Sequence, residues 1–185
     1  MDIVEIKKEL KIELKQNALK YGDFTLASGQ KSKYYINCKG VTLDAKGSYL
    51  AGAALLDLVD SQCAAVGGLT LGADPLISSM TVISHLENRP LKGFIVRKEP
   101  KGHGTQNQVE NCPPKKTKVV IIDDVITTGG SALKAAEVAL EMGLDVVLAI
   151  CLVDRCQGGE DAFKKLGIPM KSVFVIDDLL DSGLL

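Results

Sequence analysis

The sequence predicts an α/β fold in which a mostly parallel central sheet is covered by helices on both faces. Continuous apolar runs such as 119–122 (VVII) and 145–153 are typical of strands buried on both faces. Stretches with helical spacing separate these runs along the chain, as expected when parallel strands are joined by crossover helices. A length of 185 residues, with 46% apolar and 24% charged residues, suits one soluble domain, which we expect to span residues 1–185.

The N-terminal half begins with apolar residues at helical spacing. Segment 3–20 carries Ile3, Ile6, Leu10 and Leu14 on one face, which predicts an amphipathic helix. Segments 24–26 and 34–37 predict two short strands around a polar turn. After them we expect a helix over 47–59, a strand near 64–66, a helix over 75–86 and a strand over 93–96.

The C-terminal half begins with a segment, 98–118, that has almost no apolar residues and predicts a long exposed loop. After it we expect strands over 119–122, 145–153 and 172–176, and helices over 131–142 and 159–166. Parallel strands present their carboxyl ends at one edge of the sheet, where ligands bind. We therefore expect the unusual segments 67–74, 97–105, 123–131 and 154–158 to gather at that edge.

Composition argues against several classes of function. The formal net charge of −1 gives no reason to expect a nucleic-acid partner. No apolar run approaches the roughly 18 residues of a membrane-spanning helix, and the N-terminus lacks an apolar targeting segment, so we expect a cytoplasmic protein with no membrane partner. The five cysteines form no CxxC pair, and the only histidines, His85 and His103, lie far from any paired cysteines, so we expect reduced thiols and no zinc site.

Residues 127–131 (TTGGS) lie between a predicted strand and a predicted helix. Glycines let backbone N–H groups converge on one point, the helix N-terminus adds partial positive charge, and the hydroxyls of Thr127, Thr128 and Ser131 add donors. This combination suits a phosphate monoester, although neither a Walker loop nor a dinucleotide fingerprint is present. The alternative is an ordinary turn with Ser131 as the helix N-cap.

Asp123 and Asp124 directly precede this turn, where they could bind hydroxyl groups of whatever carries the phosphate. A sugar phosphate fits both features. The alternative is a pair of surface acids that close a strand, which is how we interpret Asp177 and Asp178. That second pair has no Thr- and Gly-rich turn after it, and we predict no ligand there.

The stretch 119–131 (VVIIDDVITTGGS) resembles the phosphoribosyl pyrophosphate (PRPP) signature of the type I phosphoribosyltransferases. Three further segments resemble orotate phosphoribosyltransferases: 24–37 (FTLASGQKSKYYIN) their hood, 97–105 (RKEPKGHGT) their catalytic loop, and 153–155 (VDR) their base-recognition strand end. The similarity runs in order over about residues 15 to 160. It implies the type I phosphoribosyltransferase fold, with a hood roughly over 1–40 plus the C-terminal segment and a core roughly over 41–170.

The resemblance also implies a reaction, the transfer of the 5-phosphoribosyl group from PRPP to N1 of orotate, giving orotidine 5′-monophosphate and pyrophosphate in pyrimidine synthesis. It implies Lys101, His103 and Asp124 as catalytic residues. The residues expected to bind PRPP are Arg97, Lys98, Lys101, His103, Asp123, Asp124, Val125, Ile126, Thr127, Thr128, Gly129, Gly130 and Ser131. Those expected to bind orotate are Tyr35, Ile36, Thr127 and Arg155. Mg²⁺ is the expected cofactor, held mainly by substrate oxygens. On the protein, Asp123 or Asp124 could contact the ion through a water molecule.

The cations of segment 97–103 have a chemical rationale of their own. On a flexible loop, Arg97, Lys98, Lys101 and His103 could close over a pyrophosphate leaving group and exclude water. The alternative is a solvated charge run. By resemblance the four residues serve the active site of the neighbouring subunit, which implies a homodimer with shared sites.

Arg155 follows an apolar strand, where its planar guanidinium could bind the carboxylate or ring carbonyls of orotate. The alternative is a structural ion pair with Asp154 or Glu160.

Two departures from the family pattern stand out: Ala27 and Gly72 lie where many bacterial relatives carry lysine. The competing functions are a purine or uracil phosphoribosyltransferase, a non-catalytic regulator that binds PRPP, and a sugar-phosphate binder of another reaction.

Overall fold

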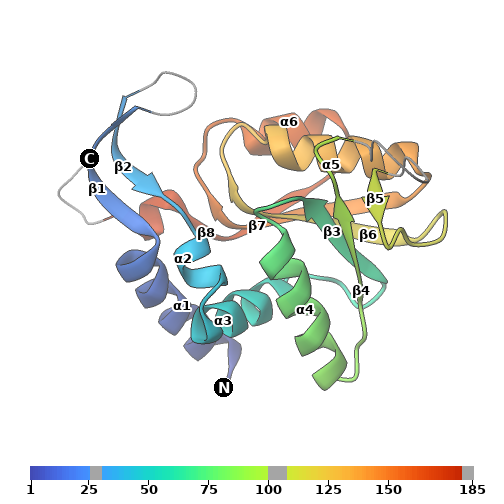
Figure 1. The fold of residues 1–185 in the computed structure, drawn as a ribbon, viewed down its shortest axis with the longest axis horizontal. Helices are drawn as coiled ribbons and strands as arrows, with labels where there is room; N and C mark the ends of the chain where they lie inside the picture. Colours follow the sequence, from blue (N-terminus) through green and yellow to red (C-terminus); the bar gives the residue numbers. More distant parts are fainter. Residues whose placement is uncertain (26–30, 100–107, 181–185) are drawn as a thin grey trace.

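A parallel sheet forms the centre of the protein, whose computed structural model describes residues 1–25, 31–99 and 108–180. The strand order in the six-stranded sheet is β5-β4-β3-β6-β7-β8, and all neighbours pair in parallel except β4 with β5 (Figure 1). The strands are β3 (Ala65–Leu69), β4 (Lys92–Val96), β5 (Val109–Glu110), β6 (Lys118–Ile126), β7 (Asp145–Asp154) and β8 (Met170–Val175). The predicted α/β class with a mostly parallel sheet is confirmed.

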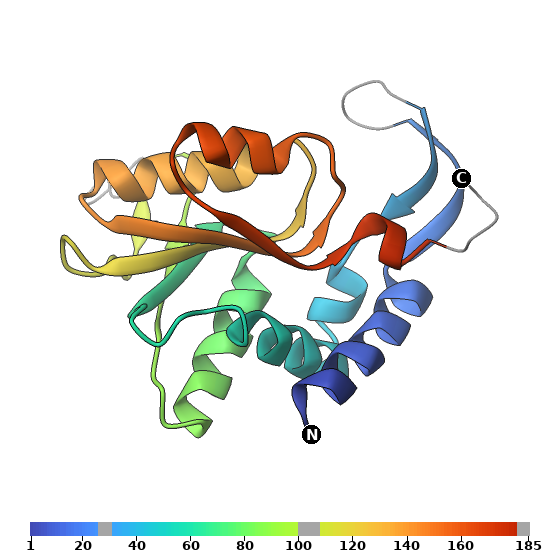
Figure 2. The same cartoon turned by 180° about the vertical axis from the view of Figure 1, so that it is seen from behind.

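Helices cover both faces of this sheet (Figures 1 and 2). One face carries α5 (Gly130–Glu141) and α6 (Gly159–Lys165), and the other carries α3 (Ala45–Leu56) and α4 (Asp74–Leu86). Successive side chains of a strand point to opposite faces, so Val119 and Ile121 of β6 pack in the cluster under α5 while Val120 and Ile122 pack in the cluster under α3 and α4. This two-sided burial explains the continuous apolar runs.

The N-terminal segment forms α1 (Ile3–Asn17), β1 (Leu19–Thr25), β2 (Lys31–Ile36) and the short α2 (Lys39–Thr42). The antiparallel β1–β2 hairpin stands apart from the main sheet, above α1 in Figure 1. One hydrophobic cluster joins Leu10 and Leu14 of α1 to Leu152 of β7 and to Ile176 in the short 3₁₀ helix η1 (Ile176–Asp178). The division into hood and core stays a prediction. Within the described ranges, no helix is long and apolar enough to cross a bilayer.

Some predicted boundaries are wrong because strand pairing overrides local spacing. The first helix was expected over 3–20 but ends at Asn17, since Leu19, Lys20 and Tyr21 pair with β2. Segment 98–118 is not wholly an exposed loop, because Val109 is buried and pairs with Val96.

The strand expected over 119–122 continues through the two acids to Ile126. Pairing with β7 persists to the end, with Val125 opposite Val153, whereas pairing with β3 stops at Ile121 opposite Gly67. Asp123 and Asp124 therefore lie within β6, beyond the point where β3 covers one side of the strand.

Candidate active site at the carboxyl edge of the sheet

The carboxyl ends of β3, β4, β6 and β7 lie at one edge of the sheet, and backbone hydrogen bonds tie the segments after them together. The N–H of Arg155 donates to Ile126 O (2.8 Å), that of Gly159 to Thr127 O (3.0 Å) and that of Thr70 to Val96 O (2.9 Å). The expected gathering of segments 67–74, 123–131 and 154–158 is confirmed. Lys101 and His103 lie outside the described residues, so their placement stays a prediction.

Asp123 and Asp124, the acid pair, are held by backbone N–H groups and by one lysine. Asp123 is 7% exposed, and its Oδ1 accepts from the N–H of Asp124 (2.9 Å). Asp124 Oδ1 accepts from the N–H of Val125 (3.0 Å), while its Oδ2 lies 3.5 Å from the Nζ of Lys39. These contacts restrict the rotation of both carboxyl groups.

The electrostatics of the acid pair are set by burial. Burial, and then the charge of Asp124, raises the pKa of Asp123 to about 8, and Lys39 acts in the opposite direction. Asp123 is therefore largely protonated near neutral pH. A protonated carboxyl can donate as well as accept a hydrogen bond, which suits a hydroxyl-bearing ligand.

Gly72 brings the turn after β3 directly against the acid pair. A Cβ atom at Gly72 would lie 2.7 Å from Asp124 Oδ1 and 3.1 Å from Asp123 Oδ1, so a side chain would require the acids to move. The turn is closed by Thr70 Oγ1, which donates to Asp74 Oδ2 (2.7 Å). Position 72, where many bacterial relatives carry lysine, is thus a position at which the backbone of this chain approaches the two carboxyl groups.

The turn over 127–131 leads into α5 through a left-handed glycine. Gly129 has φ +88° and is the N-cap, and the helix begins at Gly130. The alternative with Ser131 as N-cap is therefore wrong, because only glycine readily adopts this backbone conformation. Within the described ranges, the hydroxyls of Thr127, Thr128 and Ser131 have no intrachain hydrogen-bond partner. Together with the first N–H groups of α5 they form a donor set for an anion.

Arg155 is a buried cation beside the acid edge. The residue is 9% exposed, and its Cζ lies 5.0 Å from the centroid of the Tyr34 ring. Its buried Nε has no hydrogen-bond partner in the part of the chain that the structure describes. The alternative ion pair with Asp154 or Glu160 does not form there: Asp154 Oδ1 accepts from the N–H of Cys156 instead (2.8 Å). Because burying an unpaired guanidinium group is costly, this group points to an anionic ligand.

Strand β2 presents Tyr34 to Arg155, whereas its neighbours Tyr35 and Ile36 are the residues predicted to contact the base. Tyr35 is 42% exposed and its ring packs against Phe24, with centroids 5.6 Å apart, while Ile36 is buried in the core. Contacts of Tyr35 and Ile36 with a base stay predictions. Sequence reasoning missed Tyr34, which strand alternation places on the face opposite Tyr35, and Lys39, for which no motif gave a signal.

The first residues of the predicted catalytic loop are anchored to neighbouring elements. Arg97 Nε donates to Glu110 Oε1 (2.7 Å), and its backbone N–H donates to Gln108 O (2.9 Å). The carbonyl of Lys98 accepts from Lys134 Nζ of α5 (2.7 Å). The binding roles of Arg97 and Lys98 stay predictions.

Side chains that could hold a metal ion by themselves are sparse in the described ranges, where no group of three or more His, Cys, Asp or Glu lies together. The acid pair offers carboxyl oxygens for at most a partial coordination shell.

All five cysteines are free, and burial raises the pKa of the Cys38 thiol, which lies near Asp124.

Comparison with known proteins gives a consistent result, although no family model matches the chain. The chain is 49% identical over 178 residues to the orotate phosphoribosyltransferase of Thermosynechococcus vestitus, covering 96% of this chain and 94% of that protein. It is 43% identical over 171 residues to the orotate phosphoribosyltransferase of Aquifex aeolicus (90% and 93%). Among solved structures, the orotate phosphoribosyltransferase of Mycobacterium tuberculosis in complex with PRPP superimposes with a TM-score of 0.78 at 31% identity, covering 94% of this chain and 98% of that one.

Replacing Asp123 by Asn should stabilise the fold at pH 8 and progressively less at lower pH. The pKa of this carboxyl is about 8 when folded and near the ordinary 3.8 when unfolded, so the folded state binds more protons between these values. The Asp123 carboxyl therefore lowers the free energy of unfolding as pH rises from about 4 through about 8. The Asn variant should be more stable than the wild type by about 1 kcal/mol or more at pH 8. Thermal denaturation at pH 5, 6.5 and 8 measures it. The exposed Asp177→Asn is the control; a gain that does not grow with pH would contradict the assignment.

Proposed function

The chain belongs to the orotate phosphoribosyltransferase family, whose enzymes transfer the 5-phosphoribosyl group of PRPP to N1 of orotate with release of pyrophosphate, and we propose that the carboxyl edge of the sheet is the active site. Three features meet at this edge: the acid pair, the donor-rich turn over 127–131, and the buried Arg155. Each suits a different part of the two substrates.

The phosphoribosyl donor fits the first two features. The turn over 127–131 binds the 5′-phosphate through backbone N–H groups and hydroxyls, at the N-terminus of α5. Asp123 and Asp124 bind the ribose hydroxyls, since they directly precede that turn on β6. The backbone approach of Gly72 holds the acids from the other side.

Orotate fits Arg155, and this residue carries the assignment of the acceptor. Orotate is a planar anion with a carboxylate and ring carbonyls, which a guanidinium fork binds in its own plane. The Nε of Arg155 is buried without a hydrogen-bond partner in the described structure, and Tyr34 supports the guanidinium group from the hood. A neutral purine would leave this charge uncompensated, which favours orotate over the purine alternative.

In the reaction, N1 of orotate loses its proton to solvent or to the pyrophosphate and forms a bond to C1′ as the bond from C1′ to the pyrophosphate oxygen breaks, with inversion at C1′. The electron pair of the broken bond leaves with pyrophosphate, and the transition state resembles an oxocarbenium ion. The residues of the site contribute positioning and charge stabilisation. We assign Lys101 and His103 to the leaving pyrophosphate and Thr127 to a contact with the base. Mg²⁺, held mainly by substrate oxygens with Asp123 or Asp124 reached through water, would neutralise charge on the leaving group.

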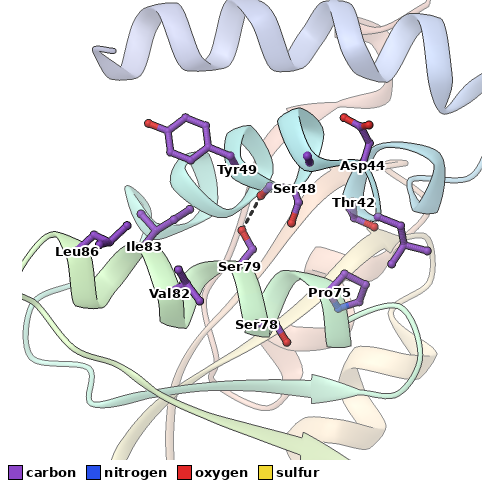
Figure 3. Close-up of a pocket in the computed structure, with 12 residues that line it drawn as sticks. Thr42, Asp44, Ser48, Tyr49, Pro75, Ser78, Ser79, Val82, Ile83 and Leu86 are labelled. Atoms are coloured by element: carbon purple, nitrogen blue, oxygen red, sulfur yellow. Dashed lines mark hydrogen bonds between the residues drawn. The ribbon is translucent and has the colours of Figure 1, made fainter.

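We assign the groove between α3 and α4, shown in Figure 3, to the binding of a second copy of the chain. The groove has a volume of about 630 Å³, and the hydrogen bond from Ser79 Oγ to Ser48 O (2.6 Å) joins its two helices. The exposed apolar side chains along it are Leu43, Tyr49, Val82 and Leu86, each between 45% and 72% exposed. Such a cluster marks an interaction surface.

The position of this groove supports a homodimer with shared active sites. Thr42, which lines one end of it, belongs to the same short helix as Lys39, and Pro75 follows the turn that contains Gly72. A partner seated in the groove therefore lies beside the acid edge. By resemblance to the family, the partner's segment 97–105 serves the active site of the first subunit.

The Arg155→Met variant should lose about 100-fold in kcat/KM for orotate, because a charge-assisted bidentate contact is removed from a buried site. Orotate consumption in the presence of PRPP and Mg²⁺, followed by ultraviolet absorbance, measures it. PRPP affinity measured by calorimetry should stay unchanged in the same variant. A wild-type protein that binds PRPP but leaves orotate untouched would overturn the acceptor assignment, and adenine, hypoxanthine, guanine and uracil would then be assayed.

Shared sites predict complementation between two inactive variants. Lys101→Ala and Asp124→Asn should each be nearly inactive alone, whereas an equimolar mixture denatured and refolded together should recover about a quarter of wild-type activity. About half of the refolded dimers are hybrids, and each hybrid contains one intact site out of two. Each variant denatured and refolded separately is the control. A mixture no more active than its components would show that Lys101 serves its own subunit or that no dimer forms.

The Leu86→Glu variant should sediment as a monomer under conditions in which the wild type sediments as a dimer, because a charge would be buried in the interface. The matched control is Leu140→Glu, on the surface of α5 on the opposite face of the sheet, where the side chain is also exposed. A dimeric Leu86→Glu protein, or a monomeric wild type, would rule out this surface as the dimer interface.

A further inference from the structure

Lys39 connects the hood hairpin to the acid pair. It is the first residue of α2, shortly after β2, and the same segment carries Tyr34, whose ring lies against Arg155. The segment from Tyr34 to Lys39 thus contacts both the residue assigned to orotate and the residues assigned to the donor.

The contact with Asp124 completes the environment of that carboxylate. Oδ1 accepts from the backbone of Val125 and faces Gly72, whereas Oδ2 lies 3.5 Å from Lys39 Nζ. The side chain of Asp124 is 14% exposed and that of Lys39 is 37% exposed. An ammonium group has three donors, so Lys39 can hold Asp124 and still offer protons to the open side of the site.

The contact between Lys39 and Asp124 also has an electrostatic effect. Asp124 carries the negative charge of the acid pair near neutral pH, and PRPP is itself a polyanion, so the approach of PRPP to Asp124 is opposed by like charge. A cation fixed beside Asp124 reduces this repulsion. Gly72, which faces the same carboxylate from the turn after β3, contributes no side chain to do so.

We propose that Lys39 is a positioning residue for the phosphoribosyl donor, which acts through Asp124 by fixing that carboxylate for the ribose hydroxyls and by offsetting the charge of the acid pair. This inference rests on the proposed function and extends it, because it adds the hood to the donor site. The segment from Tyr34 to Lys39 then serves both substrates, through Arg155 for orotate and through Asp124 for PRPP.

Steady-state kinetics of Lys39→Met and Lys39→Arg test the proposal. Lys39→Met should lose about tenfold or more in kcat/KM for PRPP, while Lys39→Arg, which keeps the charge, should stay within about threefold of wild type. The KM for orotate should change little in either variant. The matched control is Lys46→Met, which removes an exposed lysine paired with Glu9 and Glu13 and should leave activity unchanged.

A double-mutant cycle separates action through Asp124 from an independent contact with the donor. On the Asp124→Asn background, Lys39→Met should cause little further loss of PRPP affinity by calorimetry, because its partner is already neutral. Losses that add would overturn the proposal, as would a Lys39→Met protein with wild-type kinetics or an Arg variant as impaired as Met. If the wild type binds PRPP without consuming orotate, the proposed acceptor fails while the calorimetric cycle still decides the role of Lys39.

Discussion

The candidate site depends on one feature of the sheet: β6 stays paired with β7 after its pairing with β3 has ended. This keeps the backbone of Asp123 and Asp124 in strand geometry while leaving one side of it open to the turn that contains Gly72. The acids are therefore presented by a rigid element instead of a loop. The strand then turns through Gly129 into α5, so the carboxyl groups and the anion-binding N–H groups have a fixed relation to one another.

Burial of Asp123 beside Asp124 lowers the stability of the fold, and its benefit lies in the binding properties that it gives the site. Desolvation and like charge both disfavour an ionised Asp123, and a core of the same shape with an amide there would be electrostatically easier to form. Such local conflicts with folding are typical of sites retained for binding and catalysis. Lys39 and the backbone donors of Asp124 and Val125 offset part of this cost.

The segment from Tyr34 to Lys39, at the end of β2 and the start of α2, contacts both the acid pair and Arg155. Tyr34 faces Arg155, Ile36 anchors the strand in the core, and Lys39 reaches Asp124. On this proposal the absence of a side chain at Gly72 is compensated by Lys39 of α2, because Gly72 faces Asp124 Oδ1 while the ammonium group of Lys39 lies near Oδ2. The α3–α4 groove reaches the same region through Thr42 and Pro75, so the surface proposed for a second copy lies next to the proposed donor site (Figure 3).

The sequence by itself determined the α/β class, the order of the helices and strands other than α2, β5 and η1, the acid pair and the turn over 127–131, because all of these are local patterns of spacing and composition. Only the tertiary structure decided where β6 ends, since that depends on its pairing with β7, which no local pattern encodes. It also decided that Arg155 packs on Tyr34 instead of pairing with Asp154, and that Lys39 meets Asp124 across 85 positions of chain. Contacts of this kind join residues far apart in sequence, and their partners are chosen by packing of the whole domain.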